Sequence, residues 1–291
     1  MHSAEIKPDK VTKSIGEPIT SITIIRPSKG FFSIRWKELW EYRELFYFLI
    51  WRDIKVRYKQ TVIGFAWAII QPFLTMVVFS IFFGKFGKIP SEGFPYPLFV
   101  YCALVPWTYF GHSISNATNS IVENQRLIVK VYFPRLILPV SAVFSQLPDF
   151  IISFSMLILM MFFYGVMPTA NLVWLPFLIL FMSLTALAVG IWLTTFNAIY
   201  RDVRYAVPFL IQFWLFASPV AYPSSLIPEK WRAFYGLNPM AGVIEGFRWA
   251  LLGKGEPPQA LVFFSLGVIL CVLFTGIIYF RRMEGTITDV I

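Results

Sequence analysis

The chain has 291 residues, of which 57% are hydrophobic and 14% are charged. A soluble domain of this size cannot hide so much apolar surface, and the mean hydropathy of +0.66 places the chain among membrane proteins. The formal net charge is +9, but the Lys and Arg residues flank apolar stretches instead of forming one basic surface. These features exclude a soluble globular enzyme and argue against nucleic acid as a partner.

Six apolar stretches between residues 62 and 280 are long enough to cross a bilayer. We therefore predict an all-α integral membrane protein with six transmembrane helices, an N-terminal amphipathic interface helix and short re-entrant outer helices before the last span. Residues 1–32 are expected to be a cytoplasmic tail, 33–60 the interface helix and 61–291 the transmembrane domain. The expected spans are about 62–84, 97–119, 137–164, 172–199, 205–221 and 259–280.

Residues 33–60 combine apolar and basic residues at helical spacing. The apolar positions are Trp36, Leu39, Trp40, Tyr47, Ile50 and Ile54. Such a pattern is typical of a helix that lies in the membrane interface, although a soluble helix packed on a partner protein is an alternative. The candidate functional residues of this helix are Arg52, Lys55 and Arg57.

The distribution of basic residues predicts the orientation. Most Lys and Arg residues precede the first span, follow the last one, or lie in the connections after the second and fourth spans. The positive-inside rule then places both termini in the cytoplasm. The connection at 222–258 is expected on the outer side, where its two apolar runs, about 229–236 and 240–252, are too short to span a bilayer. We interpret them as interfacial or re-entrant helices.

Several motifs are absent from the sequence. There is no G-x-x-x-x-G-K-[ST] phosphate-binding loop, no H-E-x-x-H, and no aspartate pair that would hold a metal–nucleotide. The two histidines are too few for a usual zinc site, and we interpret Cys102 and Cys271 as small apolar residues. We therefore expect no catalytic residue, metal or cofactor in this chain. An enzyme of lipid-linked sugars lacks its usual groups, and a non-transporting scaffold remains an alternative.

Individual residues leave alternatives open. Asp149 lies inside a predicted span, and it has either a role on a substrate path or a structural hydrogen bond to a neighbouring helix. The amphipathic stretch at 120–136 contacts either a soluble partner or lipid phosphate. Arg201, Asp202 and Arg204 pair locally or contact a partner. Aromatic residues near Gln212 are suited to let sugar rings slide past, although packing is the usual role of any one aromatic side chain.

Four runs of the sequence resemble a known protein family. The run WRDIKVRYKQTVIGFAWAIIQPFLTMVVFSIFFGKF at 51–86 resembles the start of the membrane-spanning subunit of polysaccharide-exporting ABC transporters of the ABC-2 type. The runs at 123–140, 197–223 and 237–252 resemble the same family in the same order. The length and the N-terminal extension are most similar to those of O-antigen permeases. Permeases for capsular polysaccharide, teichoic acid or small lipophilic compounds remain alternatives.

The resemblance implies a homodimer in the bacterial inner membrane that associates with two copies of a cytoplasmic ATPase, which binds ATP and Mg. It implies export of a lipid-linked polysaccharide through a conduit at the dimer interface, with membrane lipid around it. The implied ATPase-coupling residues are Glu123, Asn124, Gln125, Arg126, Arg201, Asp202 and Arg204. The implied conduit residues are Trp107, Tyr109, Asp149, Gln212, Phe213 and Phe216. The implied outer-gate residues are Tyr222, Trp231, Tyr235, Phe247 and Trp249.

Overall fold

A computed structural model of the chain describes residues 40–59, 64–228, 231, 234–253 and 259–290. The chain divides into two units, 1–33 and 34–291, and the described helices all belong to the second. The predicted tail at 1–32 and the start of the predicted interface helix lie outside the described residues. Within the described ranges the regular structure is helical, without a β-strand.

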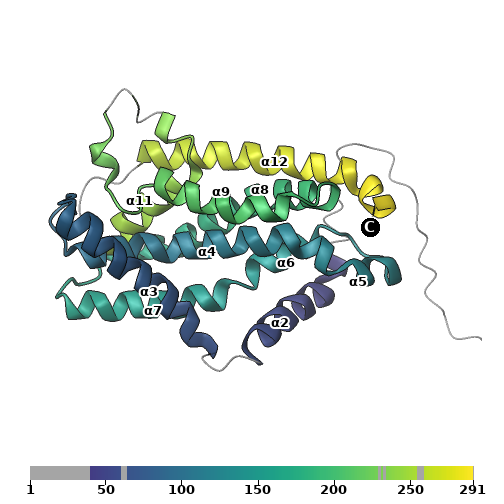
Figure 1. Cartoon of the computed structure of the whole chain (residues 1–291), viewed down its shortest axis with the longest axis horizontal. Coiled ribbons are helices and arrows are strands. Elements are labelled where there is room, and N and C mark those ends of the chain that lie inside the picture. The colour runs from purple at the N-terminus through teal and green to yellow at the C-terminus, as the bar shows by residue number, and fades with distance from the viewer. Residues whose placement is uncertain (1–39, 60–63, 229–230, 232–233, 254–258, 291) are drawn as a thin grey trace, which may run out of the picture. The chain divides into compact units, whose positions relative to one another are not determined.

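Figure 1 shows the helices of this unit. They are α2 (Arg43–Lys59), α3 (Trp67–Phe79), α4 (Tyr96–Glu123), α5 (Gln125–Lys130), α6 (Ile137–Phe144), α7 (Leu147–Phe163), α8 (Leu175–Ile199), α9 (Val203–Ala217), α11 (Pro239–Leu252) and α12 (Gln259–Val290). Short 3₁₀ helices are η1 (Gly64–Ala66), η3 (Ala170–Trp174) and η4 (Ser224–Leu226), and the π-helical turn η2 (Ser80–Phe86) continues α3.

Four stretches of the described chain are long and apolar enough to cross a membrane: Gly64–Phe86, Ile137–Phe163, Ala170–Ile199 and Leu261–Thr286. They coincide with four of the six expected spans. The expected spans at 97–119 and 205–221 correspond to α4 and α9. The first of these helices is long but more polar, and the second has only 15 residues.

Helix α4 is the central element of the unit. It packs against α3, α6, α7, α8, α9 and α11, and most of its 28 residues are buried. Because other helices cover it, α4 can carry polar groups such as Ser113, Thr118 and Ser120 that a lipid-facing helix would not tolerate. The Thr118 and Ser120 hydroxyl groups donate to backbone carbonyls of the same helix, which satisfies them locally.

Helices α4 and α8 approach closely through small residues. A Cβ atom added at Gly190 would lie 3.1 Å from the Ala117 Cβ atom, so a larger side chain at either position would push the helices apart. At the same contact, Thr194 Oγ1 donates to the Ala117 carbonyl over 2.7 Å, and Asn197 Nδ2 donates to the Thr118 carbonyl over 2.9 Å.

Two elements differ from the expected spans. The span expected at 137–164 is divided into α6 and α7 at Ser145 and Gln146, because Pro148 has no N–H to continue the hydrogen-bond ladder. The last span is longer than the expected 259–280, because α12 continues to Val290. Arg135, in the connection between α5 and α6, donates a hydrogen bond to the Glu284 carbonyl in this extension.

Candidate functional site

Helices α4 and α8 run in the same direction. Tyr109 contacts Ser183 near the middle of both helices, and Asn197 contacts Thr118 further along both. The end of α4, the short helix α5 and the start of α9 therefore lie at one end of the unit, which we call the α5 end. Helix α11 lies toward the opposite end, which we call the α11 end (Figure 1). Each end has its own polar network.

At the α5 end, α2 is attached to the break between α6 and α7. Arg57 Nη1 forms an ion pair with Asp149 Oδ2 over 2.7 Å and also donates to the Ser145 carbonyl over 3.2 Å. The Tyr58 hydroxyl donates to the other oxygen of Asp149. Asp149 is thus held by two side chains of α2. The sequence predicted this residue either on a substrate path or in a structural hydrogen bond.

A second contact attaches α2 to the start of α5. Arg52 Nη1 donates to Asn124 Oδ1 over 2.7 Å, and two other nitrogens of Arg52 contact Asp53 Oδ1. Asn124 Nδ2 donates to the Ser120 carbonyl over 2.7 Å. Asn124 is the N-cap residue of α5, so Arg52 holds the junction between α4 and the short helix that follows it.

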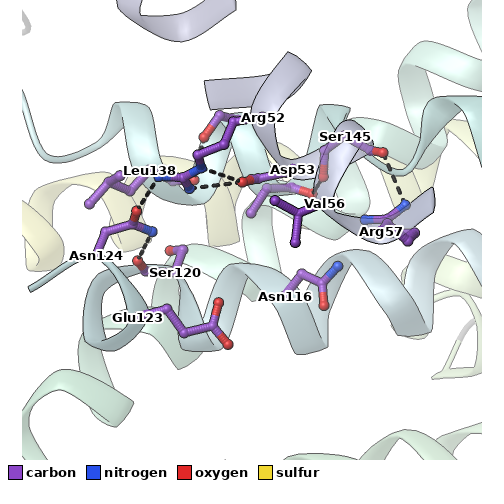
Figure 2. Close-up of a pocket in the computed structure, with 12 residues that line it drawn as sticks. Arg52, Asp53, Val56, Arg57, Asn116, Ser120, Glu123, Asn124, Leu138 and Ser145 are labelled. Atoms are coloured by element: carbon purple, nitrogen blue, oxygen red, sulfur yellow. Dashed lines mark hydrogen bonds and ion pairs between the residues drawn. The ribbon is translucent and has the colours of Figure 1, made fainter. Parts of the chain in front are cut away.

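These contacts surround a pocket between α2, α4 and α6 (Figure 2), with a cavity of about 380 Å³. Its lining is Arg52, Asp53, Val56, Arg57, Asn116, Ser120, Glu123, Asn124, Leu138, Ser141, Ala142 and Ser145. Partial burial raises the pKa of Glu123 above its ordinary value, Asp53 raises it further, and Arg52 opposes the shift. The pocket is therefore strongly polar and carries charges of both signs.

The predicted coupling residues all lie at the α5 end. Glu123 and Arg126 are exposed beside the half-buried Asn124 and Gln125, and Arg201, Asp202 and Arg204 are exposed at the start of α9. Arg204 Nη2 donates to the Tyr205 hydroxyl over 2.8 Å, and its guanidinium lies over the Tyr205 ring. The structure thus brings the two predicted groups to the same end.

At the α11 end, a buried ion pair connects three segments. Arg248 in α11 is 4% exposed, and its Nη1 lies 3.1 Å from Glu245 Oε1. Arg248 Nη2 donates to the Val220 carbonyl over 2.9 Å, and the guanidinium carbon lies 3.6 Å from the centre of the Phe99 ring in α4. One arginine therefore joins α11, the segment after α9 and the beginning of α4.

The start of α11 is fixed by Asn238. Its Oδ1 accepts from the Met240 N–H over 3.1 Å, as a helix N-cap does, and from Trp214 Nε1 over 3.0 Å. Its Nδ2 donates to Ser218 Oγ over 3.0 Å. The helix ends at Gly253, whose φ of +72° favours glycine. Both ends of α11 are thus well defined, and α11 packs against α4, α8 and α12.

The predicted gate residues have different environments. Tyr222 and Tyr235 share a hydrogen bond of 3.2 Å between their hydroxyl groups, and burial followed by this bond raises the pKa of Tyr235. Trp231 is exposed, whereas Trp249 is half-buried. Phe247 is fully buried and packs edge-on against Phe150 of α7. Phe247 is therefore a packing residue of this unit in the conformation described.

The predicted conduit residues also divide into two groups. Trp107 and Tyr109 are buried inside the unit, where Trp107 packs on Phe110 and Tyr109 on Phe150, so neither presents a surface to a conduit in this conformation. Gln212, Phe213 and Phe216, all on α9, are exposed. The apolar face of α9 is therefore the part of the predicted conduit that is open to a partner, lipid or cargo.

Sequence reasoning singled out Asn124 of the pocket at the α5 end, but not Asn116 or the serine residues of its lining. Asn116, Ser120 and Asn124 recur about one helical turn apart at the end of α4, and this polar stripe was a usable signal. Glu245 and Arg248 were also missed as a pair, although their spacing of three residues places them on one helix face.

Comparison with known proteins identifies the family. A family model described as ABC-2 type transporter matches residues 44–252, which is more than two thirds of the chain. The chain belongs to the ABC-2 type transporter family. Membership in this family, together with four apolar helices of spanning length in the described chain, indicates a multi-pass membrane protein that works within an ABC transporter.

Curated relatives of this ABC-2 family chain are named as transport proteins. The O-antigen export system permease protein RfbA of Myxococcus xanthus is 31% identical over 254 residues, which cover 85% of this chain and 96% of the relative. A Klebsiella pneumoniae protein of the same name is 26% identical over 82% of this chain and 92% of its own length. The polysialic acid transport protein KpsM of Escherichia coli is 23% identical over 81% of this chain and 92% of its own.

Proposed function

We propose that this ABC-2 family chain is the permease subunit of a transporter that exports a lipid-linked polysaccharide, with O-antigen as the favoured cargo. The observation that carries the proposal is the 31% identity to the Myxococcus xanthus O-antigen export permease over 96% of that protein. The sequence similarity extends over nearly the whole length of that protein, so it includes the segments that form the α5 end, α9 and α11.

The proposed assembly contains two copies of this chain and two copies of a separate ATPase, which binds ATP and Mg. Each chain crosses the bacterial inner membrane six times, with α4 and α9 completing the four strongly apolar spans. Burial of α4 among the other helices supports its place as a span despite its polar residues. Both termini lie in the cytoplasm, which places the α5 end inside and the α11 end outside.

The ATPase contacts the α5 end in this proposal. Glu123, Asn124, Gln125 and Arg126 lie at the junction of α4 and α5, and Arg201, Asp202 and Arg204 lie at the start of α9. Arg52 and Arg57 attach α2 to this end, while Lys55 is exposed on the same helix. A displacement of α5 by the ATPase therefore acts on a firmly connected set of helices.

The conduit forms between the two copies. Exposed aromatic side chains on α9, such as Phe209, Phe213 and Phe216, and exposed apolar residues on α3, such as Leu74 and Val78, supply an apolar face for this interface. Helix α11 lies beside the proposed outer exit and acts there as a re-entrant element, whose buried Glu245–Arg248 pair is satisfied within the protein.

Capsular polysaccharide is a second candidate cargo. The relation to the polysialic acid transport protein KpsM covers 92% of that protein and favours this alternative over a teichoic acid or a small compound. The lower identity of 23%, against 31% for the O-antigen permease, makes it the second choice.

Deletion of the gene, followed by analysis of the surface glycan and of its lipid-linked precursor, tests the proposal. We expect the surface polysaccharide to be lost and full-length lipid-linked polymer to accumulate inside the cell. An undecaprenyl anchor on the accumulated polymer supports O-antigen, and a phosphatidylglycerol-type anchor supports capsule. Short or absent polymer would instead indicate a synthetic enzyme, and an unchanged surface glycan in a strain with a single such permease would contradict export of a polysaccharide.

A further inference from the structure

The pocket between α2, α4 and α6 (Figure 2) has the size of a small-ligand site. Its cavity of about 380 Å³ lies within the range of roughly 300–1,000 Å³ that is usual for such sites. Three helices supply its walls, and nine of the twelve lining residues are polar or charged. Neither the coupling role nor the conduit assigns a function to the interior of this pocket.

The hydroxyl donors of the lining are engaged, and both of its arginines are held in ion pairs. The hydroxyl groups of Ser120, Ser141 and Ser145 donate to backbone carbonyls over 2.7, 2.9 and 2.9 Å. The guanidinium groups of Arg52 and Arg57 are held by carboxylates and by other oxygen atoms. A hydroxyl oxygen keeps lone pairs after it has donated its proton, so the serines face the pocket mainly as acceptors.

Two further groups of the lining can accept hydrogen bonds. Among the residues that the structure describes, the Glu123 carboxylate and the Asn116 amide take no hydrogen bond or ion pair, and both line the pocket. A carboxylate only accepts hydrogen bonds when it is ionised. The pocket therefore presents a surface rich in acceptors, and a ligand that fits it must bring several donors.

This chemistry selects among possible ligands. A phosphate group brings few or no donors at neutral pH. In the lining, Arg52 is paired with Asp53 and Arg57 with Asp149, so the charge left without an ion-pair partner is the negative one of Glu123, which repels an anion. A sugar ring carries several hydroxyl donors and no net charge. Amide and carboxylate oxygens together with serine hydroxyls can each accept from such a ring.

We propose that this pocket binds a sugar residue of the lipid-linked polysaccharide on the cytoplasmic side, through hydroxyl groups that donate to Glu123, Asn116 and the serine oxygens. The inference rests on the proposed function. Helix α2 is expected at the membrane interface, the level at which the sugars next to a lipid anchor lie. The pocket would hold the first sugars of the polymer beside the α5 end before the conduit opens.

A substitution series at Asn116 tests the pocket in cells that carry the full transporter. Asn116 is exposed on α4, so substitutions there do not disturb the helix core. Asn116→Trp fills the cavity and Asn116→Leu removes the acceptor at similar size, whereas Asn116→Asp keeps oxygen acceptors. We expect surface polymer to fall roughly fivefold to tenfold in the first two variants and to be retained better in the third. Thr275→Trp, at an exposed position of α12, is the matched control and should export as the parent does.

Photocrosslinking identifies the occupant directly. A benzoyl-phenylalanine placed at position 116 should give, after irradiation of cells, permease adducts that carry the cell's own polysaccharide, detected as a ladder with antiserum against that glycan. The same amino acid at position 275 should give none. Adducts at position 116 that contain only phospholipid, by mass spectrometry, would overturn the proposal in favour of a lipid headgroup.

The two proposals fail in different ways. If deletion of the gene blocks export but Asn116→Trp exports like the parent at equal membrane levels, the pocket proposal is wrong and the permease function stands. If deletion leaves the surface polysaccharide unchanged in a strain with a single such permease, the proposed function is wrong, and a sugar pocket loses its basis with it.

Discussion

Arg57 in α2 and Asp149 in α7 form an ion pair of 2.7 Å although 92 positions separate them in the chain. The pair is partly buried, with 26% and 18% of the two side chains exposed. It joins the helix that precedes the first span to the point where α6 and α7 are divided. The intramembrane acid identified from the sequence is thus matched by a cation from outside that span.

Loss of this pair should loosen α2. We expect Asp149→Ala to lower the free energy of unfolding by about 1–3 kcal/mol, because Arg57 keeps its charge without the carboxylate. Hydrogen exchange should rise in α2 and remain slow in the buried helix α4. Thermal unfolding in detergent and exchange mass spectrometry measure the two effects.

The charge-swapped variant Arg57→Asp with Asp149→Arg provides the control. It should recover part of the lost stability, because opposite charges again face each other. Equal stability of Asp149→Ala and the parent, with unchanged exchange in α2, would show that the ion pair does not hold this helix.

The raised pKa of Glu123 predicts that the stability of the fold depends on pH. Its pKa in the folded chain is raised from the ordinary value of 4.5, by partial burial first and by Asp53 second. A carboxyl group with a raised folded pKa stabilises the fold fully below its unfolded pKa and loses that contribution as the pH rises through the folded value. The stability of Glu123→Gln relative to the parent should therefore increase between about pH 4 and neutral pH.

The measurement is the free energy of unfolding against pH for both proteins. Because Gln does not titrate, the difference between the two curves isolates Glu123 from Asp53, the other carboxyl group that lines the pocket, and from Asp149, which pairs with Arg57. A difference that stays constant over this range would contradict the raised pKa.

Loss of the buried Glu245–Arg248 pair at the α11 end should lower the stability more than loss of the Arg57–Asp149 pair at the α5 end. Arg248→Met leaves the Glu245 carboxylate, whose side chain is 12% exposed, without its counter-ion and the Val220 carbonyl without its donor, which should cost about 3–5 kcal/mol. The melting temperature of the purified protein measures the loss. Arg248→Met combined with Glu245→Leu should recover part of it, since no unpaired charge remains.

A matched surface control separates this effect from a general sensitivity to loss of an arginine. Arg204→Met removes an exposed arginine whose described contacts are with Tyr205, and it should change the stability by no more than about 1 kcal/mol. Similar losses in Arg204→Met and Arg248→Met would contradict the importance of burial.

Cysteine labelling tests the proposed orientation. In a chain whose Cys102 and Cys271 are replaced by alanine, a single cysteine at the exposed Ser225, near the α11 end, should react with a membrane-impermeant maleimide added outside the inner membrane. A cysteine at the exposed Lys130 in α5 should react only after that membrane is permeabilised. The opposite pattern would reverse the orientation drawn from the positive-inside rule.

Hydropathy and charge were sufficient to predict most of the helices, because lipid-facing helices must be continuously apolar and their connections polar. The division between α6 and α7 was missed because the hydropathy of this span is continuous; Pro148, which has no N–H, was the local signal of the interruption. Of the four candidate conduit aromatics, Trp107 and Tyr109 are buried because α4 is covered on most sides, and this depends on neighbours distant in sequence.

The pocket and the two ion-pair networks could not be derived from the sequence alone. Arg57 and Asp149, or Arg248 and the Val220 carbonyl, meet only when several helices have packed. Helical spacing places Glu245 and Arg248 on one face, but it does not indicate that this face is turned inward. Packing of helices in three dimensions therefore decided which polar residues became partners.

The burial of α11 has a consequence for biogenesis. Twelve of its fourteen residues are buried, and part of their cover comes from α12, which is synthesised after it; Ser265 of α12, for example, lies against Gly242 and donates to the Gly236 carbonyl. Until α12 has been made, α11 therefore lacks part of the surface that buries it. A chain truncated before α12 would expose this segment to chaperones and membrane proteases.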